Sequence, residues 1–204
     1  MKKHEMATLI VETLGAYLSG TGFQFKKAVE GFVRPIHSGR QVLGVPLWDY
    51  DPEYEFSLNV CIRLDAVEAI FHRFSGAPRK YHALSFTTMS RLELFSGRLS
   101  HIRVTTAQQV ASAGLAIASV VREKIVPFFS AHETVEALDR AVNCQCPGID
   151  ITQNPSGAMH SVILAHLAGG QHFKQLVDKH RTEMELRSTK AHPFNDLVEY
   201  LMRL

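Results

Sequence analysis

The sequence predicts an α+β protein in which an antiparallel sheet of about five strands is covered by helices, with a C-terminal helical annex. The strongest evidence lies in residues 54–64, where apolar side chains occupy every second position. This alternation is typical of a strand with one buried face. From Asp65 the apolar spacing becomes helical, and Asp65 with Glu68 has the spacing of a capping box. The apolar positions of the predicted strand are Phe56, Leu58, Val60, Ile62 and Leu64.

The segments before this strand predict one helix and an antiparallel meander. Residues 5–19 carry apolar side chains at helical spacing and end near two glycines. Residues 32–36 and 41–48 then read as strands, because turn residues such as Ser38-Gly39 separate them. Short connections of this kind favour antiparallel neighbours, so we expect these strands to pair beside residues 54–64.

After the central strand, the apolar residues switch repeatedly between helical spacing and the every-second-residue spacing of a strand. We expect a helix at 66–74, strands at 81–88 and 99–105 with a hairpin at Phe95-Ser96-Gly97 between them, and a long helix at 106–126. Thr106 and Gln109 form a second capping box at the start of that helix, which should end before Pro127. Gly114 leaves room for close packing against another element. A further helix is expected from Ser130 to about residue 142.

The character of the chain changes after residue 142. Residues 143–157 contain prolines and glycines without periodicity and read as a connection. Three short, one-sided helices are expected at 158–168, 172–186 and 193–204. We therefore divide the chain into an α+β core domain (1–142), the connection (143–157) and a helical annex (158–204). The annex must pack on the core or form a homodimer interface, because free apolar stripes are rarely tolerated.

Composition excludes several classes of partner and location. The 204 residues carry 22 Lys and Arg against 20 Asp and Glu, a formal charge of +2 without a basic stripe, so nucleic-acid binding has no support. No segment approaches the roughly 20 apolar residues of a membrane-spanning helix. Three cysteines do not make a disulfide framework, which favours a cytoplasmic protein.

Candidate metal ligands are poorly spaced. His160 and His166 lie six residues apart and do not share a helical face. Cys144 and Cys146 would point the same way in an extended chain and are weak candidates for a soft metal ion, although such a pair in a connection is more often two small residues at a surface or packed edge. No phosphate loop or nucleophile motif is present, so no cofactor is expected.

The polar side of the predicted sheet supplies the candidate ligand-binding residues. Asn59 and Arg63 lie on the central strand, and His101 and Arg103 lie on a later one. If these strands pair, the four side chains converge on a face that can bind an anion or a peptide. The alternative is an ordinary solvated outer face.

A second candidate is the acidic and aromatic stretch at residues 48–54. Trp48, Tyr50 and Tyr54 alternate with acidic residues there. Such a stretch can present aromatic faces to a cationic partner. A turn fixed by Asp and Pro explains the same residues without any ligand.

Several motifs resemble those of a bacterial family of unknown function. Its members begin with a helix, a Gly-Phe and a basic pair, continue through an antiparallel sheet and close with a helix ending in Pro-Phe-Phe. The matching residues, within about 5–140, are Gly22-Phe23, Lys26-Lys27, Phe32, Arg34 and Pro127-Phe128-Phe129. The resemblance implies an α+β fold, no established activity, and an immunity-like or accessory role.

Two functions remain open on the sequence. The first is a bacterial cytoplasmic binding or interaction protein with a protein partner or a homo-oligomer. The alternative is an enzyme whose site lies on the polar sheet face, with Arg63, His101 and Arg103 acting on a small anionic substrate. A deep pocket around these side chains favours the enzyme, and a flat exposed face favours the binding protein.

Overall fold

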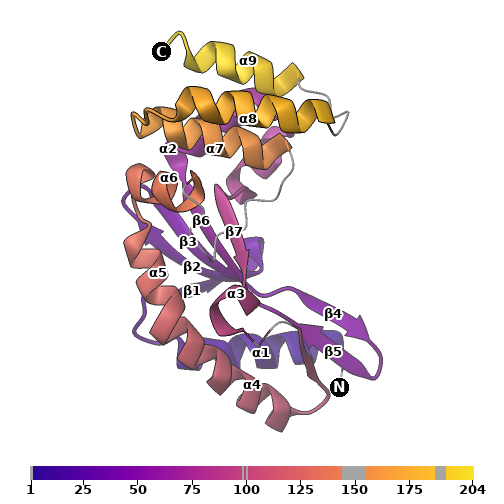
Figure 1. The fold of residues 1–204 in the computed structure, drawn as a ribbon. Helices are drawn as coiled ribbons and strands as arrows, with labels where there is room; N and C mark the ends of the chain where they lie inside the picture. Colours follow the sequence, from indigo (N-terminus) through magenta and orange to yellow (C-terminus); the bar gives the residue numbers. More distant parts are fainter. Residues whose placement is uncertain (1, 98, 100, 144–154, 187–191) are drawn as a thin grey trace. The chain divides into compact units, whose positions relative to one another are not determined.

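The computed structural model describes residues 2–97, 99, 101–143, 155–186 and 192–204 and has an α+β fold (Figure 1). Within these residues a five-stranded sheet has the order β1-β2-β3-β6-β7, and a three-stranded sheet has the order β4-β5-β8. The strands are β1 (Gln24–Lys26), β2 (Gly31–Ile36), β3 (Gly39–Gly44), β4 (Leu47–Tyr50), β5 (Glu53–Phe56), β6 (Asn59–Leu64), β7 (Thr88–Arg91) and β8 (Ile102–Val104). The predicted fold class is therefore confirmed.

Helices account for most of the remaining described chain. The α-helices are α1 (Lys3–Tyr17), α2 (Asp65–Phe74), α3 (Glu93–Ser96), α4 (Ala107–Val120), α5 (Val126–Ala131), α6 (Val135–Asn143), α7 (Pro155–Leu167), α8 (Phe173–Leu186) and α9 (His192–Leu201). Shorter turns are η1 (Lys27–Val29), η2 (Arg79–Leu84) and η3 (Val121–Ile125). None of these described helices is both long enough and apolar enough to cross a membrane.

The chain divides into two compact units. Unit 1 comprises Met1–Cys61 and Ser90–Ala131, and unit 2 comprises Ile62–Met89 and His132–Leu204. The two boundaries between the units fall within strands, between Cys61 and Ile62 in β6 and between Met89 and Ser90 in β7. The expected connection at 143–157 lies largely outside the described residues.

The long strand predicted at 54–64 is wrong in one respect, because it is two strands in two sheets. Ser57 N–H donates to the carbonyl of Pro46, the residue before β4, whereas the carbonyl of Leu58 accepts from Leu92 N–H after β7. The backbone therefore changes partners between these two residues. The predicted apolar face is confirmed, since all five of its side chains are buried. Part of the alternate face is buried too, including Glu55 and Cys61.

Unit 1 packs α1 closely against α4. Met6, Ile10 and Leu14 form the buried side of α1. Gly114 faces that helix, and a Cβ at this position would lie 2.6 Å from Cγ2 of Thr13. Even a methyl side chain would collide with Thr13 there, so the expectation of close packing at Gly114 is confirmed.

Three aromatic and basic side chains, Phe23, Arg34 and Phe129, form one cluster in unit 1. The Arg34 guanidinium lies 5.1 Å from the ring centre of Phe23 and 6.0 Å from that of Phe129. Its Nε donates to Oε1 of Gln41 at 2.6 Å, and Nε2 of Gln41 donates to the Phe129 carbonyl at 3.1 Å. Gln41 is fully buried, and its side-chain amide bonds both Arg34 and the Phe129 carbonyl, so this cluster joins β2, β3 and α5.

The helix predicted at 106–126 does not end before Pro127. Its start is confirmed, because Gln109 N–H donates to the Thr106 hydroxyl and the Gln109 side chain accepts from Thr106 N–H. At η3 the helix widens into a π-turn, in which Val126 N–H bonds the carbonyl of Val121. This register shift accommodates Pro127, which lacks an N–H, and α5 continues the helix.

Three further local predictions are wrong. Residues 79–84 form the 3₁₀ turn η2, in which Pro78 has a φ of −57° and Tyr81 N–H bonds the Pro78 carbonyl, so the strand resumes only at Thr88. The expected hairpin at residues 95–97 is the end of α3, closed by Gly97 at a φ of 69°. The helix expected from Ser130 begins at Val135, where the Thr134 hydroxyl accepts from Ala137 N–H.

Unit 2 is a helical assembly around α7. This helix contacts α2, α6, α8 and α9 (Figure 1). Every residue from Gly157 to Ala165 is buried, which is typical of a helix surrounded on all sides. Two of these buried residues, His160 and Ser161, are polar and need partners.

Candidate functional site

Six side chains in unit 1 share the outer face of the three-stranded sheet. In antiparallel strands, residues directly opposite each other point to the same side. Trp48 pairs with Glu55, Glu55 pairs with Arg103, and Tyr50 pairs with Glu53. The other side of the sheet is buried through Phe56 and Val104. We call the following residues the outer face: Trp48, Tyr50, Glu53, Glu55, His101 and Arg103.

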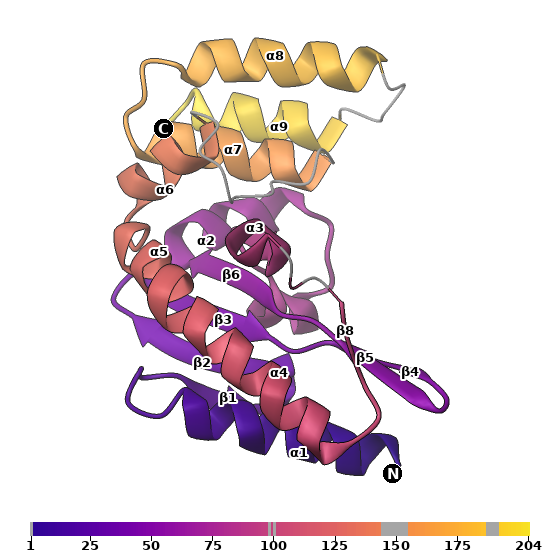
Figure 2. The same ribbon diagram turned by 60° about the horizontal axis from the view of Figure 1, so that its bottom comes forward.

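Two large aromatic side chains of this face meet solvent. Trp48 is 38% exposed and Tyr50 is 59% exposed. They stand two residues apart on β4, which is an edge strand of its sheet. Figure 2 shows the β4–β5 hairpin extending beyond the ends of β2 and β3 within the same unit. The aromatic rings therefore lie on an accessible ribbon.

Glu55 organises the middle of the outer face. Its Oε1 lies 2.7 Å from Nδ1 of His101, and its Oε2 accepts from Nε of Arg103 at 3.2 Å. The His101 ring in turn lies 5.7 Å from the ring centre of Trp48. Glu55 is itself buried. One carboxylate thus fixes both Arg103 and His101, and His101 is the neighbour of Trp48.

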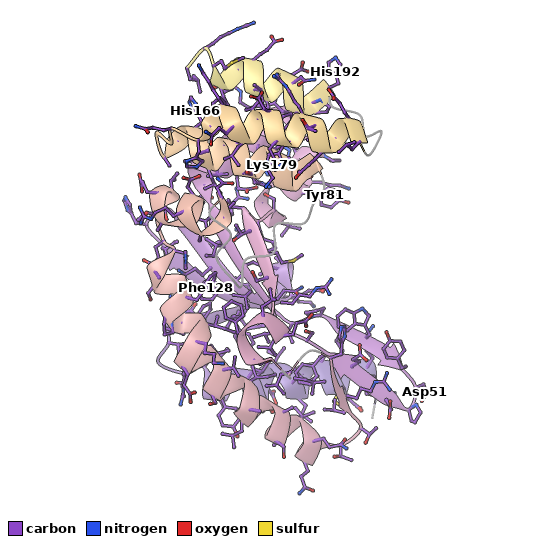
Figure 3. The ribbon with its side chains drawn as sticks, viewed as in Figure 1. Asp51, Tyr81, Phe128, His166, Lys179 and His192 are labelled. Atoms are coloured by element: carbon purple, nitrogen blue, oxygen red, sulfur yellow. The ribbon has the colours of Figure 1, made fainter. Side chains whose placement is uncertain are left out.

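The hairpin that carries this face is strongly acidic. Four of the ten residues 47–56 are acidic and none is basic. Figure 3 shows Asp51 at the tip of the hairpin. Burial raises the pKa of the Tyr54 hydroxyl, and the charges of Asp49, Asp51 and Glu5 raise it further. Burial is the larger cause of this shift, and the smaller contribution reflects the three carboxylates near Tyr54.

The four predicted ligand-binding residues do not converge on one sheet. Arg63 lies on β6, whereas Arg103 lies on β8 of the other sheet and His101 just precedes it. Asn59 begins β6 and adjoins Gly44 of β3. Nε of Arg63 pairs with Asp65 at 2.7 Å, and Arg103 is shared by Glu53 and Glu55. Both guanidiniums are thus neutralised by carboxylates of this chain, which disfavours a small anionic ligand.

Unit 2 contains a polar cluster centred on Glu68, which is fully buried. Its Oε1 accepts from the Thr87 hydroxyl at 2.9 Å and lies 3.0 Å from Nε2 of His160. Its Oε2 accepts from the Ser85 hydroxyl. A guanidinium nitrogen of Arg63 lies 3.7 Å from the same oxygen. The capping box expected for Glu68 is wrong, because α2 has no side-chain cap and the carboxylate enters the core instead.

This environment keeps Glu68 ionised. Burial alone would raise its pKa, but the charge and proximity of His160 and the hydroxyls of Ser85 and Thr87 outweigh burial and lower the pKa from 4.5 to about 2. Burial lowers the pKa of His72 more than the negative charge of Glu68 raises it. The cluster therefore holds an anion beside His72, which is favoured in its neutral form.

The contact between Ser85 and His72 is not a base-activated nucleophile. Nε2 of His72 lies 2.7 Å from Oγ of Ser85. The Ser85 hydroxyl has two oxygen acceptors besides this imidazole, the Glu68 carboxylate and the carbonyl of His82 at 3.0 Å, and it accepts from Nη1 of Arg63 at 2.7 Å. His72 is therefore not the dedicated acceptor that an activated serine hydroxyl requires. The geometry stabilises Glu68 and does not prepare an attack.

A second buried cluster mimics a Ser-His-Glu triad. Nε2 of His180 lies 3.1 Å from Oγ of Ser161, and Nδ1 lies 3.2 Å from Oε2 of Glu183. Ser161 is buried, and its hydroxyl donates to Oδ1 of Asn143 at 2.6 Å. No substrate reaches such a hydroxyl, so we assign this cluster to helix packing. Burial lowers the pKa of His180 more than Glu183 raises it.

Metal and thiol chemistry find no site in the described parts of the chain. No group of three or more His, Cys, Asp or Glu side chains there is arranged to hold a metal ion. Cys144 and Cys146 lie outside the described residues. Cys61 is buried, and desolvation raises the pKa of its thiol to about 12, so it stays protonated and unreactive.

Sequence reasoning recognised some of these residues and missed others. The alternation of aromatic and acidic residues at 48–54 did point to Trp48 and Tyr50. The alternation of residues does not reveal that Glu55 is buried, because its partners lie on and before a strand 46 residues away. His160 was not connected with Glu68 for the same reason. Comparisons with protein-family models, with curated proteins and with solved structures gave no match.

Proposed function

We propose that this protein is a non-enzymatic binding protein that engages a partner protein through the outer face. The observation that carries the proposal is the exposure of Trp48 and Tyr50 side by side on one strand. Tyrosine and tryptophan are enriched among residues that dominate binding energy. Two of them on an accessible ribbon therefore make a favourable contact surface.

The outer face is also pre-organised. Glu55 holds His101 at 2.7 Å and Arg103 at 3.2 Å, and His101 lies against Trp48. Side chains that are already fixed lose little conformational freedom when a partner binds. The predicted candidates His101 and Arg103 thus acquire a supporting role beside the aromatic side chains.

The polar clusters of unit 2 favour a binding protein over the enzymatic alternative. Glu68 and Ser161 have no exposed side to offer a substrate. Each hydroxyl in these clusters already donates to a fixed acceptor. Such satisfied networks specify how helices pack and contribute to stability.

The charge of the hairpin favours a different protein as partner over a second copy of this chain. In a symmetric dimer through the outer face, the same surface would meet itself. Two acidic hairpins would then repel each other. We accordingly propose a complex with a different protein and, in line with the sequence resemblance, an immunity-like or accessory role in a bacterial cytoplasm.

Selection from a random peptide display library tests the proposal. The wild-type protein should retain peptides that the double variant Trp48→Ala/Tyr50→Ala does not bind. Leu115→Ala is the matched control, because Leu115 is 60% exposed on α4 of the same unit. Recovery of peptides that bind the double variant as well as the wild type would contradict the proposal.

A further inference from the structure

We infer that the segment recognised by the outer face is cationic, a Lys- or Arg-rich stretch of the partner. This inference rests on the proposed function and names the chemistry of its partner. It follows from the charges around the aromatic side chains and from the geometry of those side chains.

The charges of the hairpin are only partly compensated within the chain. Arg103 is shared between Glu53, at 3.5 Å, and Glu55, at 3.2 Å. Within the described residues Asp51 has no ion-pair partner, and it is exposed at the hairpin tip. Asp49 is exposed too, but its pairing with Tyr54 puts it on the side of the hairpin opposite to Trp48 and Tyr50. Asp51, together with the two glutamates that share one arginine, thus leaves excess negative charge beside the aromatic surface, which calls for an external cation.

The aromatic side chains are suited to the same kind of ligand. The faces of Trp and Tyr rings attract ammonium and guanidinium groups, and Trp does so most strongly. Arginine also stacks on such rings through its planar guanidinium while donating to carboxylates. Asp51 at the hairpin tip and Glu53 beside Tyr50 supply those acceptors. A cationic side chain can therefore meet a ring and a carboxylate at once.

The contrast with the rest of the chain strengthens the inference. The whole protein carries a formal charge of +2, although residues 47–56 contribute four negative charges and no positive one. The hairpin is therefore a local negative region on an otherwise positive chain. Such a region steers cationic partners toward itself and not toward the remaining surface.

Fluorescence of Trp48 tests the inference directly, because Trp48 is the only tryptophan of the chain. The probes are short Gly-Ser peptides of equal length that carry several Arg, several Gln or several Glu residues. The Arg peptide should change the emission saturably, and its affinity should fall as sodium chloride rises from about 0.05 M to about 0.5 M. The Gln and Glu peptides should leave the emission unchanged.

Charge-removing variants localise the effect. Asp51→Asn/Glu53→Gln should lower the affinity of the protein for the Arg peptide by about tenfold, because two negative charges near the aromatic side chains are lost. The control Glu12→Gln/Glu123→Gln removes two exposed charges elsewhere in unit 1 and should leave the affinity unchanged. Equal binding of the Arg and Gln peptides, binding of the Glu peptide alone, or no emission change with any peptide would overturn the inference. Library peptides that need Trp48 and Tyr50 but are not basic would overturn it too, while the proposed function would stand.

Discussion

Nε2 of His160 on α7 lies 3.0 Å from Oε1 of Glu68 on α2, and the Glu68 side chain has no exposed surface. A buried carboxylate is costly unless its charge is compensated. This pair therefore connects the central helix of unit 2 to α2. It also makes Glu68 the most sensitive charged position of that unit.

Glu68→Gln should lower the free energy of unfolding by about 3 kcal/mol, because it leaves His160 without its anion. Urea unfolding followed by circular dichroism measures this difference. Glu12→Gln, at an exposed site on α1, should change stability by less than about 0.5 kcal/mol. Equal unfolding midpoints for the two variants would show that the pair contributes nothing.

Stability should decrease in mildly acidic solution. The folded-state pKa values of His72 and His180 are lowered from 6.5, so the folded protein binds fewer protons than the unfolded chain. Their contribution is complete above pH 6.5 and is lost as the pH falls through the lowered values. The contribution of Glu68 persists to lower pH, being lost only between 4.5 and about 2.

Denaturant titrations at a series of pH values measure this dependence. Unfolding midpoints should fall below pH 6.5, and His72→Gln/His180→Gln should flatten the curve over the interval just below pH 6.5. A wild-type midpoint that stays constant over this interval would contradict the assignment of neutral imidazoles.

Glu55→Ala should destabilise unit 1, because Glu55 is a buried carboxylate with two partners. The substitution leaves His101 and Arg103 without their shared acceptor and should cost about 1–2 kcal/mol. It should also alter Trp48 emission, since His101 adjoins that ring. Glu53→Ala, whose carboxylate is 46% exposed, should cost less than about 0.5 kcal/mol. Identical melting of both variants would exclude the organising role of Glu55.

Gly114→Val should loosen the packing of α1 on α4. Its Cβ would overlap Thr13, at 2.6 Å, and the expected cost is about 1–3 kcal/mol. Ala116→Val adds the same kind of side chain at an exposed position of α4 and serves as the control. Thermal unfolding of both variants gives the comparison, and a Gly114→Val protein as stable as the control would refute the close approach.

Local patterns in the sequence determined much of the fold. The alternation in residues 54–64 identified its buried face, and Thr106 with Gln109 marked the start of α4 correctly. The division into β5 and β6 escaped prediction, because it depends on Pro46 and Leu92, which are distant in sequence. The π-turn before Pro127 was likewise invisible, since a proline ordinarily predicts the end of a helix.

The candidate site was predictable only in part. Trp48 and Tyr50 stand out by residue type and spacing. The sequence alone allows two interpretations of them, a surface for a cationic partner and a turn fixed by Asp and Pro. The contacts of His101 and Arg103 with Glu55 depend on the pairing of β5 with β8, two strands that are far apart in the sequence. Arg63 was grouped with these residues on the assumption of a single sheet, whereas it belongs to the other one. Pairing between strands is the information that one sequence lacks.

The most direct test of the outer face as the binding surface is nuclear magnetic resonance mapping of amide shifts. Isotope-labelled protein would be titrated with the peptide that the library selects most strongly. The binding proposal predicts that the largest shifts fall on β4, β5 and residues 101–104, with the indole signal of Trp48 among them. Shifts concentrated on α7, α8 or α9 of unit 2, with the Trp48 signal unmoved, would contradict it.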